Sequence, residues 1–299
     1  MKTILKWLGI VLGVLLGLVL IVLAVNYFKG NTALSTSYSI APENLAIPTD
    51  AASLAHGKHI VQAICGECHT DNLSGKLLLD ASFAKIYSAN LTPGKGGAGT
   101  EFADADWVRA LRHGVDNKGR ALVVMPAEQF WNLNDQDLGD IVAYLKTLPA
   151  VDNEQPDPQI NAVGRIMIGA GIFGPAMVPA AVIAHNKRPA VVPVRVTADY
   201  GNYLISFTGC RSCHGAQLAG GKSGKPGALA APNLTPGGEL SGWTTADFIQ
   251  TIRTGVTPGG HHLNPEEMPW NYVRNYSDDE LTAIFMYLQS LPQLATVKP

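Results

Sequence analysis

Two five-residue segments of this chain carry side chains that could hold an iron-containing group. Cys65 and Cys68 are followed by His69, and Cys210 and Cys213 by His214, so each segment reads C-x-x-C-H. Two thiols at this spacing can add to the two vinyl groups of one porphyrin, and the next residue then supplies a neutral imidazole to the iron. Because the two segments use all four cysteines, they predict two covalently attached haem c groups, with His69 and His214 as iron ligands.

Other uses of paired cysteines fit the spacing less well. A structural zinc site usually has its second cysteine pair about 15–20 residues away, whereas 141 residues separate Cys68 from Cys210. A thioredoxin-like redox pair needs a βαβ setting, which the sequence lacks. A disulfide within either motif would strain a tight turn.

The sequence around the two motifs is repeated. The matching pairs are Asn90-Leu91-Thr92-Pro93 with Asn233-Leu234-Thr235-Pro236, Trp107 with Trp243, Arg112 with Arg253, Met125-Pro126 with Met268-Pro269, and Tyr144-Leu145 with Tyr287-Leu288. Two copies at so long a period indicate tandem domains of about 100 residues each rather than a solenoid.

Each copy resembles a class I cytochrome c domain, with its haem motif on an early helix, an Asn-Leu loop, a Met-Pro loop and a closing helix. The whole chain is similar to membrane-anchored dihaem cytochromes c and to cytochrome subunits of bacterial membrane dehydrogenases, although many of those carry three haems. The resemblance covers residues 51–150 and 199–297. It implies an all-α fold of two tandem cytochrome c-like domains with an N-terminal transmembrane helix.

The second axial ligand of each iron must come from outside the motifs. Met125 and Met268 stand at matching places in the two repeats, and each precedes a proline that stiffens the loop. We expect both to bind iron through the thioether sulfur. Competing ligands are His113, His261 and His262, which leaves a His/His second haem open, while His56 and His59 are interpreted as surface residues.

Three further residues are expected near the haem groups. The resemblance implies that the carbonyl of Pro232 accepts a hydrogen bond from the axial imidazole, and Ala89 stands at the equivalent place in the first copy. Arg112 and Arg253 could pair with haem propionates. A solvated surface arginine is an equally good interpretation of both.

The N-terminus carries a candidate membrane anchor. Trp7 to Val25 is an uncharged apolar run of nineteen residues, which as a helix spans about 28 Å, close to the ~30 Å hydrocarbon core. Lys2 and Lys6 precede it, which places the N-terminus in the cytoplasm and the rest of the chain outside. We expect an uncleaved anchor, with cleavage near Ala24 as the alternative.

These features give a domain plan. It has an anchor at 1–30, a polar tether at 31–50, cytochrome c domains at 51–150 and 199–299, and an apolar, proline-containing linker at 151–198. Within the linker, Ile166 to Ala184 is uncharged, but its glycines and prolines break a regular helix. A second crossing would also separate the two haem motifs. We expect this run to pack between the domains or on the membrane face, or to dock a membrane partner.

The closing helix of each domain has clear boundary signals. Asn134 and Ser277 stand at the N-cap position, and Asp137 and Glu280 follow three residues later, an arrangement that is a strict capping box only in the second copy. Pro149 and Pro292 follow the two helices. Each of these helices is expected to cross the first helix of its own domain.

The sequence favours an electron-transfer role over catalysis by the chain itself. Two irons closed by His and Met would pass electrons without binding substrate, between a quinol-oxidising complex or periplasmic dehydrogenase and an oxidase or soluble cytochrome. The expected place is the outer, periplasmic face of a bacterial cytoplasmic membrane. A dihaem peroxidase or thiosulfate-type enzyme with one open haem is the alternative. The net charge of −2 gives no case for nucleic acid.

Overall fold

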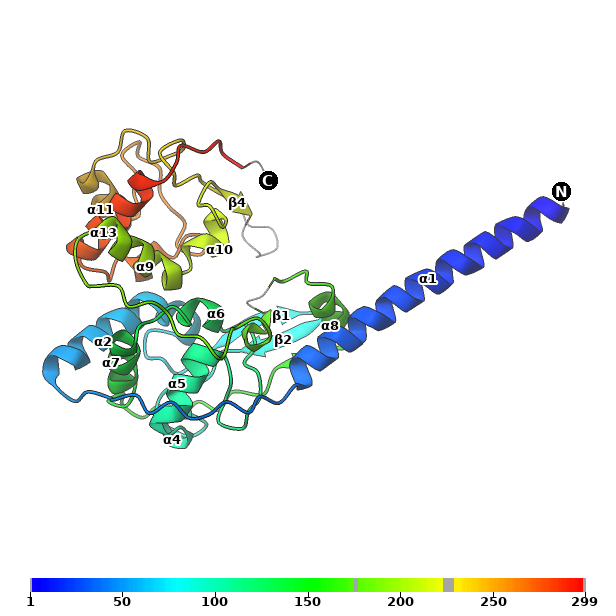
Figure 1. Cartoon of the computed structure of the whole chain (residues 1–299), viewed down its shortest axis with the longest axis horizontal. Helices are drawn as coiled ribbons and strands as arrows, with labels where there is room; N and C mark the ends of the chain where they lie inside the picture. Colours follow the sequence, from blue (N-terminus) through cyan, green and yellow to red (C-terminus); the bar gives the residue numbers. More distant parts are fainter. Residues whose placement is uncertain (1, 175–176, 223–228, 298–299) are drawn as a thin grey trace.

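The computed structural model describes residues 2–174, 177–222 and 229–297, and most of its regular structure is helical (Figure 1). The long helix α1, Lys2–Ser35, extends away from the rest of the molecule. It is the one helix in the described part of the chain that is long and apolar enough to cross a membrane. It continues past residue 30, so the first part of the expected tether is helical.

The first cytochrome-like domain is built from short helices. They are α2 (Ala51–Ile64), α3 (Gly66–His69), α4 (Ala98–Glu101), α5 (Asp104–His113), α6 (Ala127–Phe130) and α7 (Asp135–Leu145). The second domain repeats this order, and its described residues contain no counterpart of α4. Its helices are α9 (Ala198–Thr208), α10 (Cys210–His214), α11 (Thr245–Thr254), α12 (Trp270–Val273) and α13 (Asp278–Ser290).

In each domain the closing helix crosses the first helix, as the sequence predicts. The crossings are close because a glycine stands at the contact. A Cβ on Gly57 of α2 would lie 1.9 Å from the carbonyl oxygen of Asp140, and one on Gly201 of α9 would lie 1.9 Å from that of Ala283. These are equivalent positions in the two copies, so a single packing solution is used twice.

The helix ends follow the predicted capping. Asn134 and Ser277 are the N-caps of α7 and α13, and the full capping box forms only in the second copy. One repeat match is different: the N-caps Ala103 and Thr244 align Trp107 with the buried Phe248 rather than with Trp243. Trp243 instead precedes the N-cap of α11.

Small antiparallel sheets accompany the helices. In the first domain β1 (Leu77–Ala81) pairs with β2 (Ala84–Tyr87), which pairs with β3 (Gln159–Ile160) from the linker. In the second domain β4 (Gly221–Lys222) pairs with β5 (Ala230–Ala231).

The linker is packed onto the first domain and the base of α1. Its helix α8 (Ala162–Gly169) lies beside the C-terminal part of α1 (Figure 1). The 3₁₀ helix η2 (Pro179–Ala181) contacts α6. A small apolar cluster joins the linker, the sheet and α1 around the buried side chains of Ile86, Met177 and Val178.

The segment between α1 and α2 also lies on the first domain rather than free in solvent. Tyr38 donates its backbone N–H to the carbonyl of Gly119 at 2.8 Å. Glu43 receives hydrogen bonds from the buried side chains of Arg112 and His113, at 2.7 and 2.6 Å. These contacts fix how the first domain is held relative to α1.

Candidate functional site: two matching haem-attachment turns

The first C-x-x-C-H motif begins where α2 ends. Cys65 is the C-cap of α2 and the N-cap of α3, and His69 is the last residue of α3. The Nδ1 atom of His69 lies 2.8 Å from the carbonyl oxygen of Ala89. Because a carbonyl only accepts, Nδ1 carries the proton and Nε2 keeps its lone pair, which is the form of imidazole that binds iron.

The second motif has the same construction. Gly209 ends α9 in a left-handed conformation, and Cys210 to His214 form α10. His214 Nδ1 lies 2.8 Å from the carbonyl oxygen of Pro232. The tautomer is therefore fixed in the same sense as at His69.

The chain then turns in the same way after both histidines. Equivalent residues adopt positive φ in each copy, and these pairs are Thr70 with Gly215, Leu73 with Leu218, and Gly75 with Gly220. The N–H groups of Gly75 and Gly220 donate to the carbonyls of His69 and His214 at 2.9 and 3.0 Å. Two separate stretches of sequence thus build one local fold around the histidines.

The electrostatic setting suits neutral ligands. Burial lowers the pKa of both His69 and His214 against the opposing effect of their backbone hydrogen bonds. Burial raises the pKa of Cys65 to about 12 and that of Cys210 to about 11. Free thiols here would stay protonated at neutral pH, which argues against a thiolate nucleophile or a dithiol redox site.

The two Asn-Leu-Thr-Pro segments directly follow the residues whose carbonyls orient the histidines. The side-chain oxygen of buried Asn90 accepts hydrogen bonds from the N–H and hydroxyl of Thr92, and its amide donates to the carbonyl of Val151 at 2.7 Å. Asn233 makes the same bonds to Thr235 and to the carbonyl of Leu294. Each loop is therefore tied to the segment that follows the closing helix of its domain.

Both Met-Pro loops have one backbone conformation. Pro126 has φ −79° and ψ 52°, and Pro269 has φ −76° and ψ 52°. The next N–H donates back to the methionine carbonyl, at 2.8 Å for Met125 and 2.7 Å for Met268, which defines an inverse γ-turn. Both methionine side chains are partly buried and pack against the core cluster that contains Cys65 and contacts Cys210.

The competing ligands are placed differently. His113 is buried, with one nitrogen 2.6 Å from Glu43 and the other 3.0 Å from His185. His261 and His262 are exposed. Met177 lies in the small apolar cluster beside the sheet, and Met286 is exposed on α13.

The two arginines expected near the propionates have protein partners. Arg112 is buried and bonds to the carboxylates of Glu43 and Asp135. Its Nε is buried without a hydrogen-bond partner in the described residues, so one donor remains for another acceptor. Arg253 is paired with Asp278 at 2.6 Å. The propionate roles of both arginines stay predictions, and for Arg112 the Nε donor is the one left without a partner among the described residues.

The residues present fit a haem group at each motif. Each site has two half-buried or buried thiols, an imidazole held in the iron-binding tautomer, and a partly buried thioether in a rigid turn. Near the first Met-Pro loop, the indole Nε1 of Trp131 is also buried with no partner in the part of the chain described. A haem propionate is an acceptor that would satisfy such a donor.

The two domains meet through contacts that sequence reasoning missed. His59 of α2 reaches Glu280 of α13, with Nε2 and Oε2 2.6 Å apart. Tyr203 of α9 donates to the carboxylate of Asp137 of α7 and accepts the N–H of Asn134 at 3.1 Å. His59 and Tyr203 occupy equivalent places in the two first helices, so each domain helps to cap the closing helix of the other. His59 is thus an interface residue rather than a surface one.

The segments that follow the Met-Pro loops, α6 and α12 with the residues after them, also reach across this interface. Asn132 donates to the carbonyl of Ser206 at 3.3 Å, and its counterpart Asn275 donates to that of Gln62 at 3.3 Å. Gln129 bonds to Ser212, between the two cysteines of the second motif, at 2.9 Å. Its counterpart Tyr272 packs its ring on Gly66 between the cysteines of the first motif, since a Cβ there would lie 2.7 Å from Cε1.

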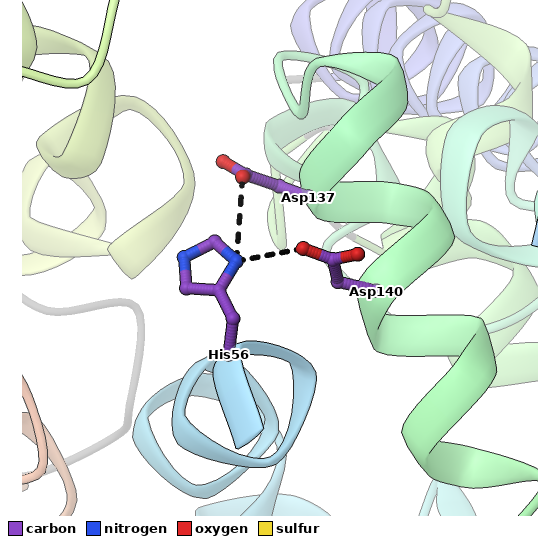
Figure 2. Close-up of side chains that lie close together, drawn as sticks. All are labelled: His56, Asp137 and Asp140. Atoms are coloured by element: carbon purple, nitrogen blue, oxygen red, sulfur yellow. Dashed lines mark hydrogen bonds and ion pairs between the residues drawn. The ribbon is translucent and has the colours of Figure 1, made fainter. Parts of the chain in front are cut away.

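His56 also points from α2 toward the start of α7 (Figure 2). Its Nδ1 lies 2.8 Å from Asp140 and 3.9 Å from Asp137. The shorter distance is that of a hydrogen bond, and the second carboxylate already serves Tyr203 and Asn134. We interpret the three side chains as a polar contact that joins α2 to α7 rather than as a metal site.

Comparison with protein families gives two matches within the chain. The family model described as Cytochrome c matches residues 54–149 and again residues 198–292. Together these segments make up well over half of the chain, and each contains one C-x-x-C-H motif and one Met-Pro loop.

Several curated proteins are similar over most of the chain. The fructose dehydrogenase cytochrome subunit of Gluconobacter japonicus is 28% identical over 90% of this chain and 61% of its own length. The cytochrome c subunit of alcohol dehydrogenase (quinone) from Gluconobacter oxydans is 26% identical over 81% of this chain and 55% of its own. A diheme cytochrome c-type protein of Cereibacter sphaeroides is 28% identical over 77% of this chain and 82% of its own length. The chain thus spans little more than half the length of the two dehydrogenase subunits.

Proposed function

Because the chain belongs to the cytochrome c family and carries two covalently attached haem c groups, we propose that it is a membrane-tethered relay subunit for a dehydrogenase. It would pass electrons from a catalytic subunit, or from a quinol-oxidising complex, to an oxidase or a soluble cytochrome. The observation that carries this proposal is the identical construction of the two haem-attachment turns and Met-Pro loops in domains that dock reciprocally. A catalyst would need one site to differ.

The proposed iron ligands are His69 with Met125 and His214 with Met268. When bound, each haem supplies reversible one-electron chemistry. The carbonyls of Ala89 and Pro232 orient the imidazoles, and the proline turns hold the thioethers. A soft, neutral thioether favours Fe(II) and closes the sixth position, so no substrate would bind at iron.

The reciprocal interface supports transfer within the chain. Helices α6 and α12, which follow the Met-Pro loops, contact the opposite haem motif through Gln129 and Tyr272. The ends of the two domains that carry the cofactors therefore face each other, instead of being separated by a flexible linker. We propose that this arrangement keeps the two cofactors at one fixed separation.

The proposed location rests on α1. Its apolar side chains are exposed on every side of the helix, as expected for contact with lipid. The lysines before the apolar run support an N-terminus in the cytoplasm and both domains on the outer face of a bacterial cytoplasmic membrane. The tether raises the effective concentration of the domains at the membrane.

Purification of the tagged full-length protein in mild detergent tests the proposal. We expect a dehydrogenase catalytic subunit to co-purify in stoichiometric amount, and its substrate to reduce both haems. Isolation of the chain alone, with rapid stoichiometric CO binding at one reduced haem, would instead favour the dihaem enzyme. Wild-type spectra recorded without CO provide the control.

A further inference from the structure

Helix α8 of the linker runs antiparallel to the end of the anchor helix. A Cβ on Gly30 would lie 1.9 Å from the carbonyl oxygen of Arg165, and one on Gly169 would lie 1.9 Å from that of Asn26. The two helices therefore touch backbone to backbone at a pair of glycines. Since Arg165 lies beside Gly30 and Gly169 beside Asn26, the chain beyond Gly169 heads toward the apolar run that ends at Val25.

The residues that follow α8, here called the linker tip, are residues 170–174. Ile172 at its centre is 63% exposed. Gly171 and Gly174 have nothing within 4 Å of an added Cβ. No charged residue occurs between Ile166 and Ala184. The linker tip thus presents an isoleucine and bare backbone at the level where the anchor becomes apolar.

A second part of the linker lines a groove along the C-terminal end of α1, which extends from Val25 to Thr36 and Tyr38. Ala181 lines an open groove of about 630 Å³ together with Val25, Phe28 and Lys29 of α1. The next residue, Val182, is 57% exposed. Tyr27 and Lys29 are residue types typical of the membrane–water interface. Apolar linker groups therefore lie beside the segment of α1 that follows its apolar run.

We propose that the linker tip and residues 181–182 are inserted in the interfacial layer of the outer leaflet, beside α1, and bind lipid. This rests on the proposed membrane anchoring of α1. A lipid bilayer is the occupant that fits, because the exposed apolar groups continue the apolar surface of a helix long enough to span it. A single helix allows the domains to rotate and tilt, whereas a second contact fixes them.

The contact would orient the first Met-Pro loop. Val124, directly before Met125, donates its N–H to the carbonyl of Met177 at 3.1 Å. A Cβ added to Gly114 would lie 3.0 Å from Cγ of Pro179 and 3.1 Å from Cβ of Ala127 in α6, so Pro179 packs close to both. The linker thus joins the lipid contact to the first haem site and would present that site at one angle to membrane partners.

Depth-dependent fluorescence quenching of the haem-loaded full-length protein in phosphatidylcholine/phosphatidylglycerol vesicles tests this. An environment-sensitive NBD dye is attached to single added cysteines in Ile172→Cys and, as a second reporter, Val182→Cys. Leu12→Cys reports on the anchor and exposed Leu229→Cys on the second domain. We expect the Ile172 and Val182 dyes to be quenched by lipids with a nitroxide near the headgroup, and several-fold less by iodide than the Leu229 dye.

The reporters separate the possible failures. Iodide quenching at Leu12 would refute the anchor itself. A second outcome would overturn only the inserted tip. In it, lipid quenches the Leu12 dye, while iodide quenches the Ile172 and Val182 dyes as strongly as the Leu229 dye. If neither lipid nor iodide quenches the tip dyes, protein covers them, for example a second copy of the chain. This result would also overturn the proposal.

Discussion

The chemistry of this molecule at the residue scale depends on which groups are kept neutral and how they are aimed. A backbone carbonyl holds each motif histidine with Nε2 unprotonated, and burial lowers the pKa of both rings. The histidines therefore need not lose a proton before binding iron at neutral pH. A rigid proline turn positions each methionine that we propose as the second ligand, so geometry rather than charge would select the ligands.

Alanine substitution of the two methionines tests the proposed ligands. Wild-type oxidised protein should show the near-infrared methionine–iron charge-transfer band from both haems. Met125→Ala and Met268→Ala should each remove about half of its intensity and lower the potential of one haem, because the neutral thioether is lost.

Met286→Ala is the matched control, since that side chain is exposed on α13 and should leave the band unchanged. Absence of the band from the wild-type protein would refute both assignments. Full intensity in either single variant would refute that one.

At the scale of elements, a glycine at each helix crossing sets how closely the first and last helices of a domain approach. The approach brings Gly57 against the backbone of α7 and Gly201 against that of α13. Any side chain at these positions must push the helices apart, and the core between them would lose contacts.

Gly57→Ala and Gly201→Ala should therefore each lower the free energy of unfolding by about 3 kcal/mol, despite the better helix propensity of alanine. Urea titration followed by far-UV circular dichroism of the haem-loaded protein measures this. Gly17→Ala in α1 is the control, because an added Cβ there meets nothing within 4 Å. Equal stability of all three variants would show that the crossings have room to spare.

The sequence could predict elements whose signals are local. The haem motifs, the N-caps at Asn134 and Ser277, and the Met-Pro loops each lie within a few residues, so their meaning needs no knowledge of the fold. The contact of His59 with Glu280 joins positions 221 residues apart, and Gly30 meets Gly169. The local sequence around His59 or Gly30 does not predict the partner of that residue, because such contacts depend on how whole elements pack.

On the scale of the whole molecule, the interface is built twice from equivalent positions but with different acids. Glu280 is bonded to His59 and Ser277, and although burial alone would raise its pKa, these partners bring it below its ordinary value. Burial raises the pKa of Asp137 in spite of the Tyr203 hydrogen bond and the nearby His56. The contributions of Glu280 and Asp137 to the free energy of unfolding should therefore change with pH in opposite directions.

Glu280→Gln should cost about 1–3 kcal/mol of stability at pH 7, because it breaks a charged hydrogen bond that is largely buried. A lowered folded-state pKa means that this stabilisation is present above the ordinary glutamate pKa and disappears as pH falls through the folded-state value. Urea titrations of both proteins from pH 7 down to pH 4 and below should show the difference shrinking.

Asp137→Asn is the matched variant in the other half of the interface. The raised pKa of Asp137 means that its protonated form stabilises the fold at low pH and that this is lost as pH rises through the folded-state value. The effect of Asp137→Asn should therefore grow as pH falls. Parallel pH trends for the two variants would contradict the assigned charge states.

The central claim is that one chain carries two porphyrins, each bonded through its own pair of cysteines. Intact-mass measurement after acid–acetone extraction tests it directly. The wild-type protein should keep two haem adducts. The double variant Cys65→Ser/Cys68→Ser should keep one, and so should the double variant Cys210→Ser/Cys213→Ser. The variant with all four substitutions should keep none. A colourless wild-type chain, or one that retains fewer than two adducts, would contradict the account.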